Sequence, residues 1–511
     1  MIHTDTESAT GINRTGLAVL LAIGLGVAAD QLVLRQGLTG AGFGCWMVLM
    51  LAAVHCLSRS GYQSPWQTCW TLFALLATLL LSFRSTPVLI PMMLLVLLSC
   101  SVNWILQQRS VDRRDITVLD YPWTTLRIPA LFLQSLWQSV SAVDPALIPR
   151  SRVRGVIKGL VLAIPMLLVF ALLFASADAR FNGYLSSVSQ LFSFSAVEHL
   201  ITTVLLSVLS FAVLAMVLRK PDPGRLEVPD QLRLGREETL IIMGSLVLLF
   251  LVFVVLQASY LFGGQAIIEQ TSGLTIAEYA RRGFFEMLVV AGLTLLVLLA
   301  MSGLRCDARI FRPLAVIMVG LVLIIMISAL QRLLLYVETF GLTVDRLLAL
   351  AVMLWLAATL IGFVLTVLRG RPQGFAFASV VFGMTLLLIA GFMNPAALVA
   401  RTNLHRVMAD GGGPVDLRYL ERLGADAVPV ILATFDDLPE SLQCELGRLL
   451  TKAWPADKGA SDWRQWNASR AAAQRQVALN REKLDRLYEQ QLDDLMTRVI
   501  PQQGPGIFKI C

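Results

Sequence analysis

The chain has 511 residues, of which 56% are hydrophobic and 15% are charged, and its net charge is +7. Soluble domains contain about 45–50% apolar and about 25% charged residues, so this composition excludes a water-soluble globular fold. Much of the positive charge lies in connections between apolar stretches, where it predicts orientation against anionic lipid and no binding to nucleic acid.

Eleven apolar stretches fill the first 393 residues. A bilayer core is crossed by roughly 20 apolar residues in a helix, and each segment must satisfy its own backbone hydrogen bonds in lipid. The sequence therefore predicts an all-α, polytopic transmembrane helix bundle of about 11 spans. The predicted spans are Gly16–Leu34, Leu38–Leu57, Trp66–Phe83, Pro87–Ile105, Gly159–Ser176, Leu200–Leu218, Leu240–Ser259, Met287–Leu304, Leu314–Leu330, Leu347–Leu368 and Phe375–Met393.

The longest connection between spans, residues 107–158, is basic. Pro129 suits the first turn of a helix, where its missing N–H is not needed. Four apolar residues then share one face: Leu133, Leu136, Trp137 and Val140. This pattern predicts an amphipathic helix on the cytoplasmic membrane surface, either a lipid sensor or gating lever or a connector that rests on the bilayer.

Lysine and arginine are distributed unevenly among the connections. The alternate connections that include Arg14 and residues 107–158 carry twenty basic residues, and the other set carries seven. Because basic loops stay in the cytoplasm, we expect a cytoplasmic N-terminus. An odd number of spans then places the C-terminal region on the opposite side of the membrane.

Residues 394–511 are polar and charged, and they predict a small soluble all-helical domain. Gly411–Gly413 is expected to stop one helix. Two residues are expected to cap the next two helices: Asp416 and Asp426. A long amphipathic helix is expected to begin at Ser461 and Asp462. Its apolar stripe, which would pack on the domain or pair with another chain, is Leu484, Tyr488, Leu492, Leu495 and Val499.

Two charged clusters lie near the ends of predicted spans, where charge is costly. The first, with alternating sign at a spacing of four, is Glu278, Arg281, Arg282 and Glu286. The second is Arg332, Glu338, Asp345 and Arg346. It surrounds a turn in which Gly341 is expected to end one helix and Thr343 to cap the next. Both clusters are predicted on the non-cytoplasmic side. They indicate either a polar cavity for an ion, small solute or lipid head group, or snorkelling arginines neutralised by carboxylates.

Catalytic motifs are absent from the sequence, which contains no GxxxxGK[ST], HExxH, GxSxG or protein-kinase set. The seven cysteines form no CxxC pair and the four histidines are scattered. We therefore expect no enzymatic activity, no cofactor and no metal site. Asn467 and Ser469 match a glycosylation acceptor, a three-residue pattern that often occurs by chance.

A series of short motifs runs through residues 155–475. They are Tyr260-Leu-Phe-Gly-Gly264, Leu274-Thr-Ile-Ala-Glu-Tyr-Ala-Arg-Arg-Gly-Phe-Phe-Glu286, Arg332-Leu-Leu-Leu-Tyr336, Gly341-Leu-Thr343, Arg346, Asn394-Pro395, Asn403, Arg406, Asp416, Tyr419-Leu420, Asp426-Ala-Val-Pro429, Trp463, Trp466 and Asn467. Together they resemble a bacterial integral-membrane family defined as a domain of unknown function. The resemblance implies a polytopic inner-membrane protein with a helical C-terminal extension, and it implies no reaction.

Four regions follow: a four-span N-terminal region (1–106), a basic loop (107–158), a seven-span core (159–393) and the helical C-terminal domain (394–511). The favoured hypothesis is a membrane-embedded sensor or scaffold that binds another membrane or periplasmic protein through its C-terminal helices. The alternative is a transporter or channel that uses the two charged clusters. A membrane enzyme acting on lipid or envelope substrates is the least favoured, because no acid, base or metal constellation supports it.

Overall fold

The structure is a computed structural model that describes residues 4–34, 39–58, 65–108, 118, 120–141, parts of 159–183, 195–224, 234–262, 284–304, 306–372, 374–409, 416–455 and 462–499. Within these ranges every regular element is a helix, which confirms the all-α prediction. The elements discussed below are α1 (Thr4–Ala29), the π-helix η1 (Asp30–Leu34), α2 (Ala41–Ser58), α3 (Pro65–Phe83), α4 (Leu89–Gln108), α5 (Asp120–Ser141), α8 (Ser195–Arg219), α9 (Arg236–Phe262), α12 (Phe284–Gly303), α13 (Ala308–Phe340), α14 (Val344–Leu365), α15 (Phe375–Phe392), α16 (Pro395–Ala409), α17 (Leu417–Arg422), η4 (Gly424–Asp426), α18 (Val428–Ala433), η5 (Phe435–Asp437), α19 (Glu440–Ala453), η6 (Trp463–Gln465) and α20 (Ala468–Val499).

Nine helices of the described chain are long and apolar enough to cross a membrane, and each matches a predicted span. The predicted span Trp66–Phe83 is α3, whose apolar part, Gln67–Phe83, is near the lower length limit for crossing a bilayer. The predicted span Gly159–Ser176 is described only in part, and the residues that are described there are helical. Large apolar side chains on α9, such as Leu249 and Val255, are each 63% exposed. Such a surface requires lipid as its solvent.

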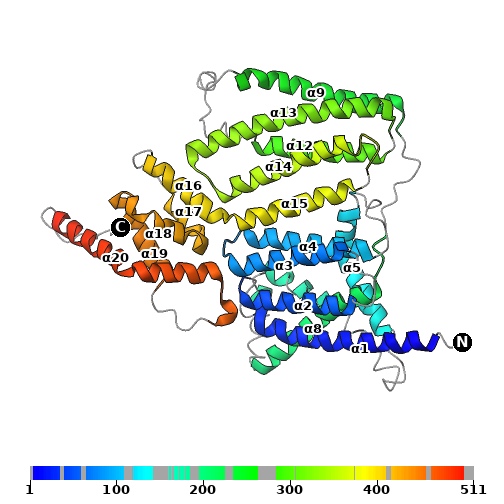
Figure 1. Cartoon of the computed structure of the whole chain (residues 1–511), viewed down its shortest axis with the longest axis horizontal. Coiled ribbons are helices and arrows are strands. Elements are labelled where there is room, and N and C mark those ends of the chain that lie inside the picture. The colour runs from blue at the N-terminus through cyan, green and yellow to red at the C-terminus, as the bar shows by residue number, and fades with distance from the viewer. Residues whose placement is uncertain are drawn as a thin grey trace.

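Three large apolar clusters join the helices of the bundle, whose arrangement Figure 1 shows. One joins α9, α12, α13 and α14; a second joins α2, α3, α4 and α15; a third joins α1, α2 and α8. Helix α8 thus packs on α1, and α15 packs on α3 and α4, across the predicted boundaries between the N-terminal region and the core. Those boundaries stay a prediction.

The C-terminal helices α16–α20 lie at one end of the bundle and the N-terminus lies at the opposite end (Figure 1). At the end of the bundle where α16–α20 lie, the end of α1 meets the start of α8, because Asp30 bonds to His199 and Thr202. Helix α5 contacts the far ends of α4 and α8, through Tyr121 to Asn103 and Arg219 to Ser139. The chain therefore passes from one end of the bundle to the other between α5 and α8.

One expectation for α5 is wrong. The helix begins at Asp120, and Pro129 lies inside it rather than at its first turn. A helix tolerates an internal proline when packing against neighbouring elements compensates for the lost hydrogen bond. Its buried face contains Thr124, Leu131, Ser135, Leu136 and Ser139, whereas the predicted face residue Trp137 is 48% exposed. The placement of α5 on a membrane surface stays a prediction.

In the C-terminal region Asp416 caps α17, as predicted, by accepting the N–H of Tyr419 at 3.0 Å. Asp426 does not cap α18, because it lies in η4 and its carboxylate is taken by another part of the chain. The long helix α20 begins at Ala468, later than predicted, because Asp462 caps the short helix η6 instead. Of the predicted stripe Leu484 is buried, and the other four side chains lie outside the described residues.

Gly26 allows α1 and α8 to pack closely. A Cβ atom there would lie 2.6 Å from the backbone nitrogen of Ser207 and 2.7 Å from its Cα atom. Gly26→Ala must push the two backbones apart, and overpacking costs about 1–3 kcal/mol. We expect a lower thermal unfolding midpoint in detergent, measured as the fraction of monodisperse protein that remains after heating.

The matched control is Gly24→Ala on the same helix, because a Cβ there has nothing within 4 Å. That variant should unfold at the wild-type temperature or slightly above it, since alanine favours helix over glycine. Equal midpoints for the two variants would contradict the close packing of α1 on α8.

Candidate functional site

The two predicted charged clusters are described to different extents in the structure. Glu278, Arg281 and Arg282 lie outside the described residues, and Glu286 lies in the first turn of α12. All four members of the second cluster are described: Arg332 and Glu338 on α13, and Asp345 and Arg346 in the first turn of α14.

The turn between α13 and α14 has the predicted form. Gly341 ends α13 with a φ of 81°, and Thr343 caps α14 by accepting the N–H of Arg346 at 3.3 Å. The turn docks onto α16, because Asn403 accepts the N–H of Leu342 at 2.8 Å and donates to the carbonyl oxygen of the same residue at 2.9 Å.

The same turn also docks onto α17. The Tyr419 hydroxyl accepts the N–H of Val344 at 2.8 Å. Burial of the Tyr419 phenol raises its pKa above the ordinary value. The hydroxyl therefore keeps its proton near neutral pH and remains available as a donor as well as an acceptor.

One cavity, of about 460 Å³, lies away from this turn, next to Arg84 and Asp426. A second, of about 510 Å³, lies between the turn and α16–α17. The second cavity is lined by the predicted residues Glu338 and Arg346, and by Arg406 and Asp416. The predicted second cluster thus contributes two residues to one polar cavity at the end of the bundle.

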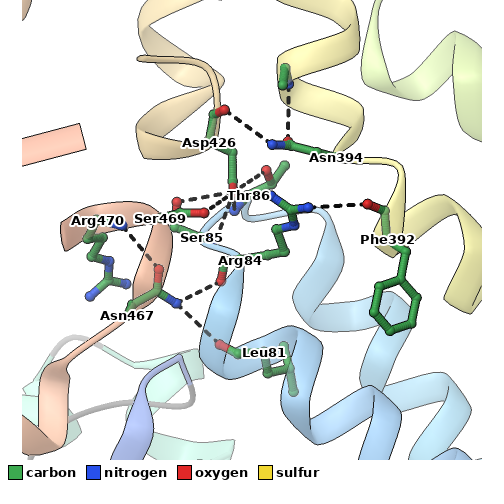
Figure 2. Close-up of polar contacts among 11 residues, drawn as sticks. Leu81, Arg84, Ser85, Thr86, Phe392, Asn394, Asp426, Asn467, Ser469 and Arg470 are labelled. Atoms are coloured by element: carbon green, nitrogen blue, oxygen red, sulfur yellow. Dashed lines mark hydrogen bonds and ion pairs between the residues drawn. The ribbon is translucent and has the colours of Figure 1, made fainter. Parts of the chain in front are cut away.

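A buried carboxylate, that of Asp426, lies at the centre of the junction between the bundle and the C-terminal helices (Figure 2). Its side chain is 0% exposed. One oxygen accepts the backbone N–H groups of Ser85 and Thr86, both at 2.7 Å, and their hydroxyl groups at 3.2 and 2.7 Å. The other oxygen accepts the hydroxyl of Ser469 on α20. The Arg84 guanidinium stands 3.8 Å from it.

Two asparagines extend this network in both directions (Figure 2). Asn467 donates to the carbonyl oxygen of Arg84 at 2.9 Å and accepts the N–H of Arg470 at 3.3 Å, so it joins the end of α3 to the start of α20. Asn394 donates to the backbone carbonyl of Asp426 at 3.4 Å and accepts the N–H of Ala397 in α16. We call Arg84, Ser85, Thr86, Asn394, Asp426, Asn467 and Ser469 the junction cluster.

The C-terminal helices make further contacts with the first two spans. The backbone N–H of Ala41 donates to Trp466 at 2.8 Å, and Arg464 donates to the carbonyl oxygen of Gln31 at 2.9 Å. Next to Gln31, the buried Asp30 carboxylate lies 2.7 Å from the Nδ1 atom of His199. Polar contacts therefore tie η1, α2 and the end of α3 to the segment from η6 to the start of α20 at one end of the bundle.

The sequence interpretation missed the junction cluster. It treated Asp426 as a helix cap and Asn467 with Ser469 as a chance glycosylation match, yet Asn467 is 1% exposed and cannot present an acceptor amide to solvent. The available signal was the resemblance, whose motifs include Asn394, Asp426 and Asn467. Nothing in the local pattern connected them to Ser85 and Thr86, which are more than 300 residues away.

These observations define a polytopic, all-helical membrane protein whose C-terminal helices are fixed to one end of the bundle through a buried carboxylate. A model of a family described as a domain of unknown function, DUF4153, matches residues 45–434, and the chain belongs to that family. The match begins in α2, well before the predicted residue 155, and ends before η6. No curated protein and no solved structure matches the chain.

Proposed function

We propose that the protein is a membrane-embedded sensor or scaffold in which α16–α20 bind a protein partner and the junction cluster couples that region to the spans. The observation that carries this proposal is the Asp426 carboxylate, whose donors come from the α3–α4 connection and from α20. Any shift between these two elements must break or rebuild several charge-assisted hydrogen bonds in a buried site. Such a site favours two discrete arrangements over a gradual change.

The proposal places the protein in a bacterial inner membrane with its N-terminus in the cytoplasm and α16–α20 in the periplasm. The uneven distribution of basic residues supports this orientation. The position of α16–α20 at the end of the bundle opposite the N-terminus supports it as well (Figure 1). The partner would then be another membrane or periplasmic protein.

An exposed position on α20 offers a direct test. Leu479 is a large apolar residue that is 75% exposed on this polar helix. A photo-crosslinking amino acid at position 479 should give one discrete crosslinked product in intact cells. If the junction cluster couples the spans to the partner, Asp426→Asn should reduce the yield of that product severalfold.

The matched control is Asp436→Asn, because the Asp436 side chain is 74% exposed and lies in the same helical region. It should leave the crosslinking yield unchanged. A wild-type protein that gives no discrete product, or equal yields from both variants, would contradict the proposed function.

The transporter alternative requires a water-reachable cavity beside the charged clusters. The cavity lined by Glu338 and Arg346 is favourable to it, but that cavity lies between the bundle end and α16–α17, where it suits binding better than passage. The proposed function assigns no reaction to the protein.

A further inference from the structure

The cavity of about 510 Å³ contains two arginines from different helices. Arg346 comes from the first turn of α14 and Arg406 from α16. Both side chains are half-buried, whereas Glu338 and Asp416, which also line the cavity, are exposed. The positive groups therefore lie deeper in protein than the negative ones, and solvent screens the carboxylates more strongly.

Among the described residues, neither guanidinium pairs with a carboxylate. Arg346 donates to the carbonyl oxygen of Gly341, and its Cζ atom lies 4.0 Å from the centre of the Tyr336 ring. Arg406 donates to the carbonyl oxygen of Glu338 at 3.1 Å. Within the described chain no acidic side chain forms an ion pair with either arginine. Each guanidinium has five N–H donors, so most of them remain for a ligand.

The absence of a side chain at Gly341 lets the Arg406 guanidinium lie against the turn between α13 and α14. A Cβ atom at Gly341 would lie 3.1 Å from a terminal nitrogen of Arg406 and 2.7 Å from the Asn403 side-chain oxygen. Glycine at this positive φ removes both conflicts. The stacking on Tyr336 fixes the plane of Arg346, and a fixed planar fork suits bidentate binding of an oxyanion.

We propose that this cavity binds a phosphate group between Arg346 and Arg406. Hydroxyl groups of Thr343 and Tyr419 line the same space and are suited to the remaining phosphate oxygens, whereas the Thr339 hydroxyl already donates to the carbonyl oxygen of Leu335 at 2.8 Å. The volume exceeds what inorganic phosphate needs, and Phe340, Leu342 and Val407 add apolar walls. Phe340 is 47% exposed at the end of a span. The phosphate belongs either to a lipid head group or to a free anion, and this site is independent of the proposed partner binding.

Calorimetric titration of the full chain in an uncharged detergent tests the site with two probes, dihexanoyl phosphatidylglycerol and inorganic phosphate. We expect saturable binding that weakens by about tenfold in Arg406→Gln and in Arg346→Gln, in line with about 1.4 kcal/mol for one lost charge-assisted contact. Tighter binding of the lipid identifies a head-group site, and equal binding of phosphate identifies a free anion.

The matched control is Arg401→Gln, since Arg401 is exposed on α16 and does not line the cavity. It should bind both probes as the wild type does. Arg406→Lys keeps the charge without the planar fork and should bind with intermediate strength, which separates ligand binding from misfolding. Unchanged affinity for both probes in Arg406→Gln, or no binding by the wild type, would overturn the proposal.

Discussion

Replacing Asp426 with alanine is expected to detach α16–α20 from the bundle. The change leaves the N–H groups of Ser85 and Thr86, and three hydroxyl groups, without their acceptor in a buried site. An unsatisfied buried donor costs about 1–3 kcal/mol, and removal of one member of a buried charged network costs about 3–5 kcal/mol. The ion pair with Arg84 adds little, because Arg84 is 27% exposed and the distance is 3.8 Å.

A loss of about 3–5 kcal/mol is large beside the 5–15 kcal/mol that stabilises a typical domain. We therefore expect faster hydrogen exchange in the first turns of α20 and in η4, while the exchange of α9 and α13 stays unchanged. Limited proteolysis in detergent should release a C-terminal fragment from the variant at protease concentrations that leave the wild type intact.

Asp426→Asn is the conservative variant. It keeps the volume but replaces one acceptor oxygen with a donor that faces other donors, so we expect an intermediate loss of protection. Asp436→Asn serves as the control, because Asp436 is largely exposed and bonds only to Lys483 among the contacts described for its side chain. If Asp426→Ala exchanged its amide hydrogens at the wild-type rate, the C-terminal helices would be held on the bundle by apolar packing alone.

The sequence predicted the bundle well because the signal for a span is strong and local. A run such as Leu240–Ser259 has one physical solution in lipid, and α9 contains all of it. The turn at Gly341 and Thr343 was equally predictable, since a positive φ and a cap require particular residues at particular positions.

Tertiary partners were beyond the local pattern. Asp426 precedes a short helix, so its sequence context is that of a helix cap. Its carboxylate instead accepts the backbone N–H groups of Ser85 and Thr86 in the connection between two spans. The contact of the buried Asp30 with His199 was missed for the same reason, because the two residues are 169 positions apart. The start of α5 was misplaced because packing against α4 and α8 outweighs the local preference of Pro129.

A reporter fused after Cys511 is expected to be active only outside the cytoplasm. Alkaline phosphatase at that position should be active, and green fluorescent protein there should be dark. The reason is electrostatic: twenty basic residues lie in the connections of one side and seven in those of the other. Each lysine or arginine near an anionic leaflet contributes about 1 kcal/mol of attraction, so this asymmetry is large enough to fix the orientation.

A truncated fusion after Asp222 provides the control, because this residue follows α8, whose last residue contacts α5 at the end of the bundle away from α16–α20. Its reporters should show the reverse pattern, with bright fluorescence and no phosphatase activity. Fluorescence at both fusion points would require an even number of membrane crossings between them, whereas α9, α12, α13, α14 and α15 are five. If both fusion points showed the opposite of the expected reporter pattern, the five crossings would stand and the whole bundle would be inverted. The junction cluster and the phosphate site would then lie in the cytoplasm.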